Sequence, residues 1–249
     1  MNSLGIMRLT FEEELKLVGQ PVDKNMWITS PTIINAFYYY PGNSLTIPAG
    51  ILQIPFFDGK LPDALNYGAI GAFIGHEISH GFDDVGSQYD ENGNVRDWWS
   101  SKIKSEYNKR ASCFKKKFSK YIIKIKNQSY KLDSIQTLSE NIADTTGINA
   151  LYKAFTIHSM KHPTQANVKL PGLEHLNSRK LLFLSWAHSF CARPKLSDLL
   201  NTMKSDTHSP ATFRIIGTLS NIKAFSDTYQ CAKGTTMNPA DPVDKCGIW

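Results

Sequence analysis

The segment His76-Glu77-Ile78-Ser79-His80 places two metal-binding side chains and a carboxylate within little more than one helical turn. At 3.6 residues per turn, His76 and His80 lie one turn apart on the same helix face, so both imidazoles can reach one cation. Glu77 lies beside that face, where a carboxylate can take a proton from a metal-activated water without being a ligand. The segment therefore predicts a helical zinc site with an adjacent general base.

The residues in front of this segment also favour a helix. Ile70, Phe73, Ile74 and Ile78 recur at spacings of three and four, as expected for an amphipathic helix with a buried face. The alternative is a pair of core histidines that hydrogen-bond and hold no metal. That alternative leaves Glu77 buried and in need of its own partner, so the metal site is favoured.

A catalytic zinc needs a third protein ligand and an open position for water, so another ligand must come from elsewhere in the chain. A third histidine six residues after the motif is excluded, because that position is Gly86. Asp83 and Asp84 are nearer, but they are more simply explained as partners of a liganding histidine or as turn carboxylates. Glu140 is the better candidate: Thr137 and Glu140 fit a capping box that opens a helix, although the same fit allows Glu140 to be only a cap.

The segment Glu140-Asn141-Ile142-Ala143-Asp144 places a second carboxylate one turn after the first. On a helix, Asp144 would lie on the same side as Glu140. There it can accept the free ring N–H of a liganding histidine, for which His76 is the best candidate.

Five ordered segments, together with the end of the chain, resemble the neprilysin and endothelin-converting-enzyme family of zinc metallopeptidases. The segments are Asn35-Ala36-Phe37-Tyr38, Pro48-Ala49-Gly50-Ile51-Leu52-Gln53, Gly75 to Asp84, Glu140 to Asp144, and His208-Ser209-Pro210 through Phe213-Arg214, and the ending is Cys246-Gly247-Ile248-Trp249. The resemblance implies a mainly α fold with a small β element. The implied fold is that of a thermolysin-like (gluzincin) zinc peptidase catalytic domain.

The resemblance also implies a role for each matching residue. The implied zinc ligands are His76, His80 and Glu140, with Glu77 as general base, Asp144 as the carboxylate behind a ligand, His208 as the oxyanion-stabilising side chain, and Arg214, Asn35 and Ala36 as substrate-binding residues. A histidine beside a carboxylate, as in Asp206-Thr207-His208, can be held charged or correctly oriented by it. Without the resemblance, this triplet reads as an ordinary turn into a helix, since Ser209-Pro210 fits a helix start.

The implied activity is that of a zinc metalloendopeptidase with one Zn²⁺ per chain. By resemblance, it would hydrolyse oligopeptides on the amino side of hydrophobic residues. Family members are several hundred residues longer than these 249 residues, and their amino-terminal region covers the active site. We therefore expect a single catalytic domain, residues 1–249, without that covering region. The alternative is a truncated, weakly active or inactive domain that binds zinc and peptides.

Cysteines and a glycosylation sequon bear on the compartment. By resemblance, Cys113 pairs with Cys246, whereas the usual partners of Cys191 and Cys231 belong to the missing amino-terminal region. The sequon Asn127-Gln128-Ser129 agrees with an oxidising compartment. The resemblance implies an extracellular or membrane-associated ectodomain, although neither a signal peptide nor a membrane-spanning segment is visible in this sequence.

The net charge of +6 raises the question of nucleic-acid binding. Six lysines between positions 115 and 126 carry much of this charge, without the glycine-rich or stacking aromatic motifs of nucleic-acid sites, so we expect a solvated helix face and no nucleic-acid partner.

Periodicity predicts a helix and then extended segments within 11–60, notably at 33–40 and 45–48. It predicts further helices near 65–80, 98–120, 138–159, 178–192, 210–217 and 219–231, with polar connections at 81–97, 121–137 and 160–177.

Overall fold

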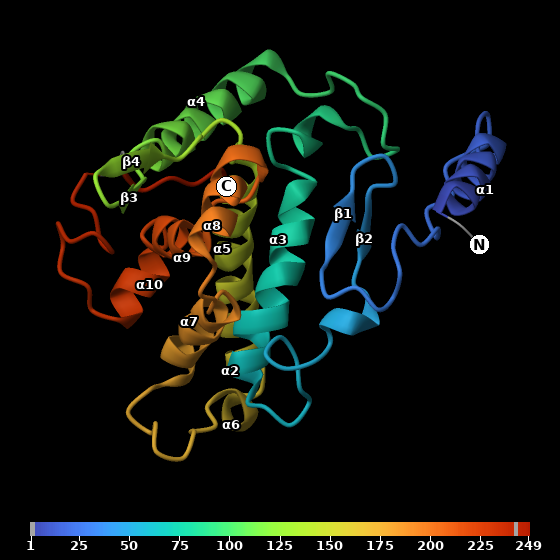
Figure 1. The fold of residues 1–249 in the computed structure, drawn as a ribbon. Coiled ribbons are helices and arrows are strands. Elements are labelled where there is room, and N and C mark those ends of the chain that lie inside the picture. Colours follow the sequence, from blue (N-terminus) through green and yellow to red (C-terminus); the bar gives the residue numbers. More distant parts are fainter. Residues whose placement is uncertain (1–2, 242–243) are drawn as a thin grey trace.

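The computed structural model describes residues 3–241 and 244–249, and their fold is mainly helical (Figure 1). The α-helices are α1 (Ser3–Lys16), α2 (Asp63–Asn66), α3 (Ala72–His80), α4 (Ser101–Phe118), α5 (Leu138–Lys161), α6 (Pro163–Ala166), α7 (Ser178–Ser189), α8 (Leu196–Ser205), α9 (Ala211–Leu219) and α10 (Lys223–Thr228). Short 3₁₀ turns lie at Ala49–Ile51 and Gly86–Gln88, and a π-helical turn, Tyr67–Gly71, joins α2 to α3.

Two small antiparallel hairpins complete the fold. Strand β1 (Phe37–Tyr39) pairs with β2 (Ser44–Thr46), and β3 (Ile122–Ile125) pairs with β4 (Gln128–Lys131). The first hairpin lies beside α3, whereas the second lies at the end of α4 (Figure 1). The predicted class, mainly α with a small β element, is confirmed.

Helices α3 and α5 pack against each other at the centre of the molecule, and two glycines allow their backbones to touch. A β-carbon on Gly147 would lie 2.6 Å from the backbone nitrogen of His76, and one on Gly75 would lie 2.9 Å from the carbonyl oxygen of Gly147. Neither position accepts a larger residue without a shift of the helices, because the nearest atoms are backbone. This contact holds the His76 turn of α3 directly against α5.

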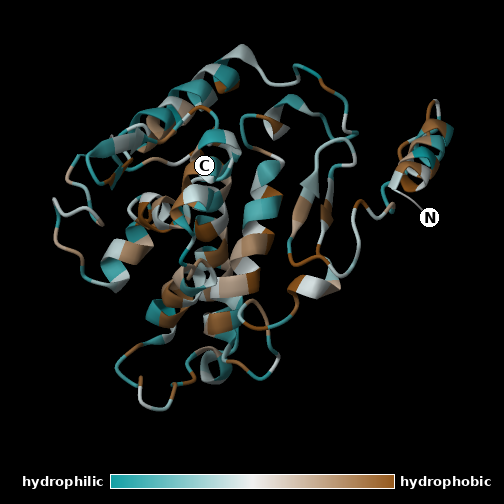
Figure 2. Ribbon diagram, in the orientation of Figure 1, coloured by the Kyte–Doolittle hydropathy of each residue, from teal (hydrophilic) through white to brown (hydrophobic). Residues whose placement is uncertain are grey.

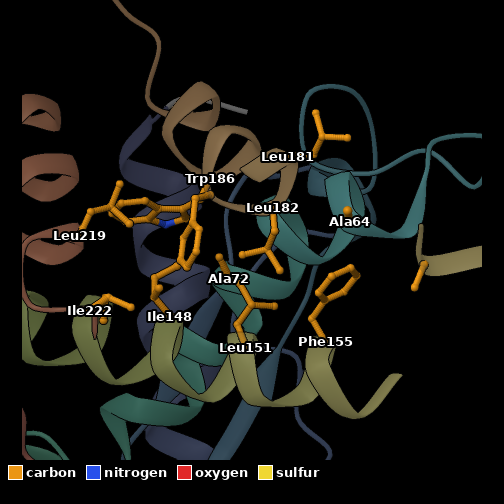
Figure 3. Packing of buried hydrophobic residues seen from close by; sticks show 12 residues of the cluster. Ala64, Ala72, Ile148, Leu151, Phe155, Leu181, Leu182, Trp186, Leu219 and Ile222 are labelled. Carbon is orange, nitrogen blue, oxygen red and sulfur yellow. The ribbon is translucent and has the colours of Figure 1, made fainter. Parts of the chain in front are cut away.

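One hydrophobic cluster fixes the carboxyl-terminal half of α5. Ile148 and Leu151 of α5 point toward Leu182 and Trp186 of α7, and Phe155 lies further along the same helix (Figure 3). All five side chains are buried. Burying one such side chain contributes about 1.5–3 kcal/mol, so this cluster is a major support of the α3–α5–α7 arrangement.

A second cluster fixes the amino-terminal half of α5 beneath α4. Phe114 and Phe118 of α4 pack with Ile142 of α5 and with Ile248 near the chain end. A disulfide joins Cys113 to Cys246, with a Cα–Cα distance of 5.6 Å. The end of the chain is therefore anchored to α4, as the family resemblance implied.

A buried lysine adds to this anchor. The Nζ atom of Lys117 donates to Asn221 Oδ1 at 2.5 Å and to the carbonyl oxygen of Asp244 at 3.0 Å. Burial lowers the pKa of Lys117 to about 7. The same Asn221 oxygen accepts the backbone N–H of Cys246, so one polar cluster holds α4, the segment between α9 and α10, and the chain end together.

Helix α1 lies apart from the other helices, beyond the first hairpin (Figure 1). None of its residues is buried. Hydrophobic residues, coloured brown, are therefore found on this outlying helix as well as in the interior (Figure 2).

The expected helices agree with the structure from position 65 onward, but three elements were missed. Helix α6, helix α8 and the β3–β4 hairpin occupy segments for which no helix or strand was predicted. In the hairpin, Ile123 and Ile125 are half-buried while Ile122 and Lys124 are exposed, which is the alternation of a strand with one covered face. The lysines of this segment obscured that alternation.

Candidate metal centre

The two histidines of α3 turn the same ring atom toward each other. Their Nε2 atoms lie 3.0 Å apart, and the rings are nearly perpendicular. Both residues are buried. Two nitrogens bound to one tetrahedral zinc at 2.0–2.1 Å lie about 3.3 Å apart, so the observed separation suits shared coordination of one ion.

Glu140 reaches the same point from the first turn of α5. Its Oε2 atom lies 3.2 Å from His76 Nε2 and 3.6 Å from His80 Nε2. One ligand atom from each of these three residues lies within 4.8 Å of the other two. Within the described chain, Glu140 Oε2 is buried without a hydrogen bond of good geometry, which is costly for a carboxylate oxygen unless a cation, either a metal ion or a protonated histidine, lies beside it. The donor set therefore fits a zinc ion.

The capping box expected at Thr137 and Glu140 is wrong. The Thr137 side chain makes no cap hydrogen bond, and its backbone is not in the extended conformation that such a cap requires. Instead, the Thr137 hydroxyl donates to the carbonyl oxygen of Asp133 and accepts the Asn141 side-chain N–H. The Glu140 carboxylate is consequently free to face the histidines.

Each histidine has a carboxylate at its other ring nitrogen. His76 Nδ1 lies 2.8 Å from Asp144 Oδ1, and His80 Nδ1 lies 2.6 Å from Asp83 Oδ2. A proton on each Nδ1 leaves the Nε2 lone pair for a metal, so the carboxylates select the binding tautomer. The structure thus brings Asp144 to His76, and of the two aspartates left open after the motif it brings Asp83, not Asp84, to His80.

In the metal-free centre, His76 is protonated and Glu140 is ionised, so the two form a charged pair. Burial lowers the pKa of His76, but close contacts with Asp144 and Glu140 outweigh burial and raise it to about 9. Burial raises the pKa of Glu140, but the contact with His76 and the neighbouring histidine charges lower it to about 2. A metal must therefore displace a proton from His76, which couples its binding to pH.

Glu77 lies among these groups but is bonded to none of them. Within residues 3–241 and 244–249, no hydrogen bond or ion pair involves its carboxylate, although the residue is buried. Burial raises its pKa, and the positive charges of His76 and His80 only partly oppose that rise. A carboxylate with a raised pKa beside a metal site is suited to accept and return a proton at neutral pH.

His208, in the segment between α8 and α9, also reaches the centre. Its Nε2 atom lies 3.1 Å from Glu140 Oε2, and its Nδ1 lies 2.8 Å from Asp206 Oδ1. The backbone N–H of His208 also donates to Asp206 Oδ1. Gln136, which sequence reasoning did not single out, donates to the carbonyl oxygen of Asp206 at 2.7 Å.

Arg214 of α9 forms a buried, two-point ion pair with Asp144. Its Nε atom donates to Asp144 Oδ2 at 2.8 Å, and Nη2 donates to Oδ1 at 2.7 Å. Burial raises the pKa of Asp144, but Arg214 outweighs burial and holds that pKa well below its usual range. The guanidinium also lies over the ring of Phe190, 4.7 Å from its centroid. Arg214 thus supports the carboxylate behind His76, a contact that sequence reasoning did not foresee.

Asn35 and Ala36 immediately precede β1, at the hairpin beside α3. The Asn35 side-chain oxygen accepts the backbone N–H of Ala36 at 2.9 Å. At the other end of the strand, the Tyr40 hydroxyl donates to Asp83 Oδ2. Tyr40 was also missed, because nothing in a run of three tyrosines, 38–40, distinguishes one hydroxyl from the next.

The geometry defines a His-His-Glu metal centre on two packed helices, the arrangement of thermolysin-like zinc peptidases. A family model described as Peptidase family M13 matches residues 35–244, and the chain belongs to that family.

Curated relatives and solved structures agree with this assignment. The chain is 40% identical over 236 residues to neprilysin-11 of Caenorhabditis elegans, covering 95% of this chain and 27% of the relative. It is 38% identical over 248 residues to human neprilysin, covering all of this chain and 32% of the relative. The crystal structure of the Mycobacterium tuberculosis zinc metalloprotease Zmp1 with an inhibitor superposes with a TM-score of 0.87 at 31% identity, covering 96% of this chain and 36% of that one.

The chain therefore spans about a third or less of the length of these relatives. The part that it matches is the carboxyl-terminal catalytic part of the homologues. Within the residues that the structure describes, no helix combines the length and the hydrophobicity needed to cross a membrane.

Proposed function

We propose that this chain is a zinc-dependent metalloendopeptidase that hydrolyses oligopeptides on the amino side of hydrophobic residues. The observation that carries the proposal is the convergence of His76, His80 and Glu140 within 4.8 Å, beside a buried Glu77 that has no hydrogen-bond partner among the described residues. Membership of Peptidase family M13 supports the reaction class.

His76, His80 and Glu140 would hold one zinc ion, and three protein ligands would leave that ion able to bind a water. Bound zinc supplies Lewis acidity, which lowers the pKa of water and polarises a peptide carbonyl. Asp144 and Asp83 keep the two imidazoles in the tautomer that presents Nε2 to the metal.

The protein's own groups would move the proton and hold the developing charge. Glu77 accepts a proton from the attacking water and passes it to the leaving nitrogen, for which its raised pKa is suited. His208, oriented by Asp206 through Nδ1, offers Nε2–H to the oxygen of the tetrahedral intermediate. His208 is 44% exposed at its side chain, so it remains accessible to a substrate.

Substrate position and side-chain preference involve different residues. Asn35 and Ala36 would bond the substrate backbone beside β1, and Arg214 would use the guanidinium edge not taken by Asp144 to bind a carbonyl oxygen. Phe73 and Phe190 lie close to each other, with ring centroids 5.8 Å apart, next to Arg214. These rings favour a hydrophobic substrate side chain.

Cleavage of a hydrophobic oligopeptide by the purified, zinc-loaded chain tests the proposal. We expect cleavage before the hydrophobic residue, one zinc per chain, and a loss of kcat by about 10²–10⁴ in Glu77→Gln with zinc retained. Mass spectrometry of the products locates the cut. Equal turnover by the parent and Glu77→Gln would contradict the role of Glu77.

A second candidate is a zinc-binding, peptide-binding domain with little or no activity. The His76–His80–Glu140 donor set would hold zinc equally well in this candidate. Zinc retained by the parent with no turnover, together with measurable peptide binding, would select this candidate.

We also propose an extracellular or ectodomain location, with no nucleic-acid partner. The Cys113–Cys246 disulfide and the exposed Asn127 of the sequon, in the turn between β3 and β4, support it. Expression through a secretory pathway should give a mass increase that glycosidase removes and that Asn127→Gln abolishes. A chain secreted without glycan would contradict the glycosylation.

A further inference from the structure

Tyr40 connects the first hairpin to the metal centre. It directly follows β1, and its hydroxyl donates to Asp83 Oδ2 at 3.1 Å and lies 3.4 Å from His80 Nδ1. Its ring stacks on Tyr89, with centroids 5.5 Å apart and an interplanar angle of 20°. The ring is thus held by packing, and its hydroxyl lies beside a candidate ligand and that ligand's carboxylate.

Asp83 has its acceptor capacity filled by four protein donors. Oδ1 accepts the backbone N–H groups of Val85 and Gly86 at 2.8 Å and 2.7 Å, and Oδ2 accepts from His80 and Tyr40. An ionised carboxylate offers about four such sites, and Asp83 is completely buried. Water cannot readily replace the Tyr40 hydroxyl there, so its loss leaves a buried oxygen short of one donor.

We propose that the Tyr40 hydroxyl is a positioning group that ties the β1–β2 hairpin to His80 through Asp83. The hairpin follows directly from Asn35 and Ala36, the residues assigned to the substrate backbone. One hydrogen bond therefore relates the substrate edge to the metal ligand. Only its consequence for substrate rests on the proposed peptidase function; the link to the metal centre does not.

Tyr40→Phe removes the hydroxyl and keeps the ring that stacks on Tyr89. Tyr39→Phe is the matched control, because within the described residues the Tyr39 hydroxyl makes no hydrogen bond. Competition with a chromophoric chelator measures zinc affinity in each purified chain. Loss of a group behind a ligand's partner should raise the zinc dissociation constant about 3–10-fold in Tyr40→Phe, with no change in Tyr39→Phe.

Amide hydrogen exchange provides a readout that needs no activity. We expect exchange within 35–46 to become several-fold faster in Tyr40→Phe, because the hairpin loses its bond to the α3 end of the centre. Thermal unfolding confirms that each variant is folded. Failure of the parent to cleave peptides would sink the proposed function, yet zinc affinity and exchange would still decide the role of Tyr40.

A double-mutant cycle with Asp83→Asn separates this route from simple packing. If Tyr40 acts through Asp83, the effect of Tyr40→Phe on zinc affinity should fall below about twofold in the Asp83→Asn background. An equal effect in both backgrounds would overturn the proposal. So would zinc affinity or hairpin exchange that stays at the parent value in Tyr40→Phe, since the tether requires both to change.

Discussion

His76 and His80 lie one turn apart on α3, and each Nδ1 atom faces an aspartate, yet the two aspartates differ in origin and in the charge of the groups that bind them. Asp144, behind His76, comes from α5 and is paired with the Arg214 guanidinium of α9. Asp83, behind His80, comes from the segment just after α3 and is surrounded by neutral donors, namely two backbone N–H groups and the Tyr40 hydroxyl.

We call Asp144 with Arg214 the charged support of His76, and Asp83 with its neutral donors the neutral support of His80. We expect the two supports to have different roles. The Asp144–Arg214 pair buries two full charges between helices, so removing one partner leaves the other uncompensated and destabilises the fold. The Asp83 support is built from neutral hydrogen bonds, each with a modest net effect on stability. We therefore expect the first support to control folding as well as metal position, and the second to act chiefly on metal position.

The largest expected effect comes from breaking the charged support. Arg214→Met retains side-chain length but removes the two guanidinium hydrogen bonds of the buried Asp144, and it should lower the free energy of unfolding by about 3–5 kcal/mol. Tyr40→Phe, at the neutral support, should lower it by about 1 kcal/mol. Urea unfolding of the metal-free chains measures both. Equal losses in the two variants would remove the distinction between the supports.

A smaller effect concerns the charge held on His76. In the metal-free chain its folded pKa of about 9 lies above the unfolded value, so its stabilisation is complete below pH 6.5 and is lost as pH rises through 9. This contribution should decrease by about 1–3 kcal/mol over that range. Over the same range zinc affinity should rise, because less proton has to be displaced.

Titration of Lys117 changes the stability with pH in the opposite direction, so its contribution must be separated from that of His76. Burial lowers its pKa to about 7, so its deprotonated folded form gains stability relative to the unfolded chain as pH rises above 7. The test is therefore the difference between the parent and His76→Asn in urea unfolding at pH 6.5 and 9. A difference that stays constant or grows with pH would refute the charged state of His76.

The local part of this centre could be predicted from the sequence, and the long-range part could not. His76, Glu77 and His80 share a helical turn, so their spacing alone specifies a common face. The pair of Asp83 and His80 is also local, three residues apart, although the sequence left two aspartates as candidates.

The contacts that complete the centre join residues with no periodic relation. Arg214 and Asp144 are 70 residues apart, and Tyr40 and Asp83 are 43 apart. Family resemblance pointed to Arg214, but as a substrate-binding side chain rather than as the partner of Asp144. At Thr137 a local pattern misled, because the Asp133 carbonyl oxygen takes the hydroxyl that a capping box needs.

The smallest expected effect concerns a third support, in which Gln136 and Asp206 hold His208. Gln136 donates to the Asp206 carbonyl oxygen, and Asp206 in turn orients His208 through Nδ1. Because His208 is not among the zinc ligands, Gln136→Ala should lower stability by only about 0.5–1.5 kcal/mol and leave zinc affinity unchanged. Peptide kcat should fall by about fivefold, since 1 kcal/mol of misplacement corresponds to such a factor. Gln128→Ala, an exposed glutamine on β4, is the control. A parallel fall in zinc affinity would show instead that Gln136 supports the start of α5 and Glu140.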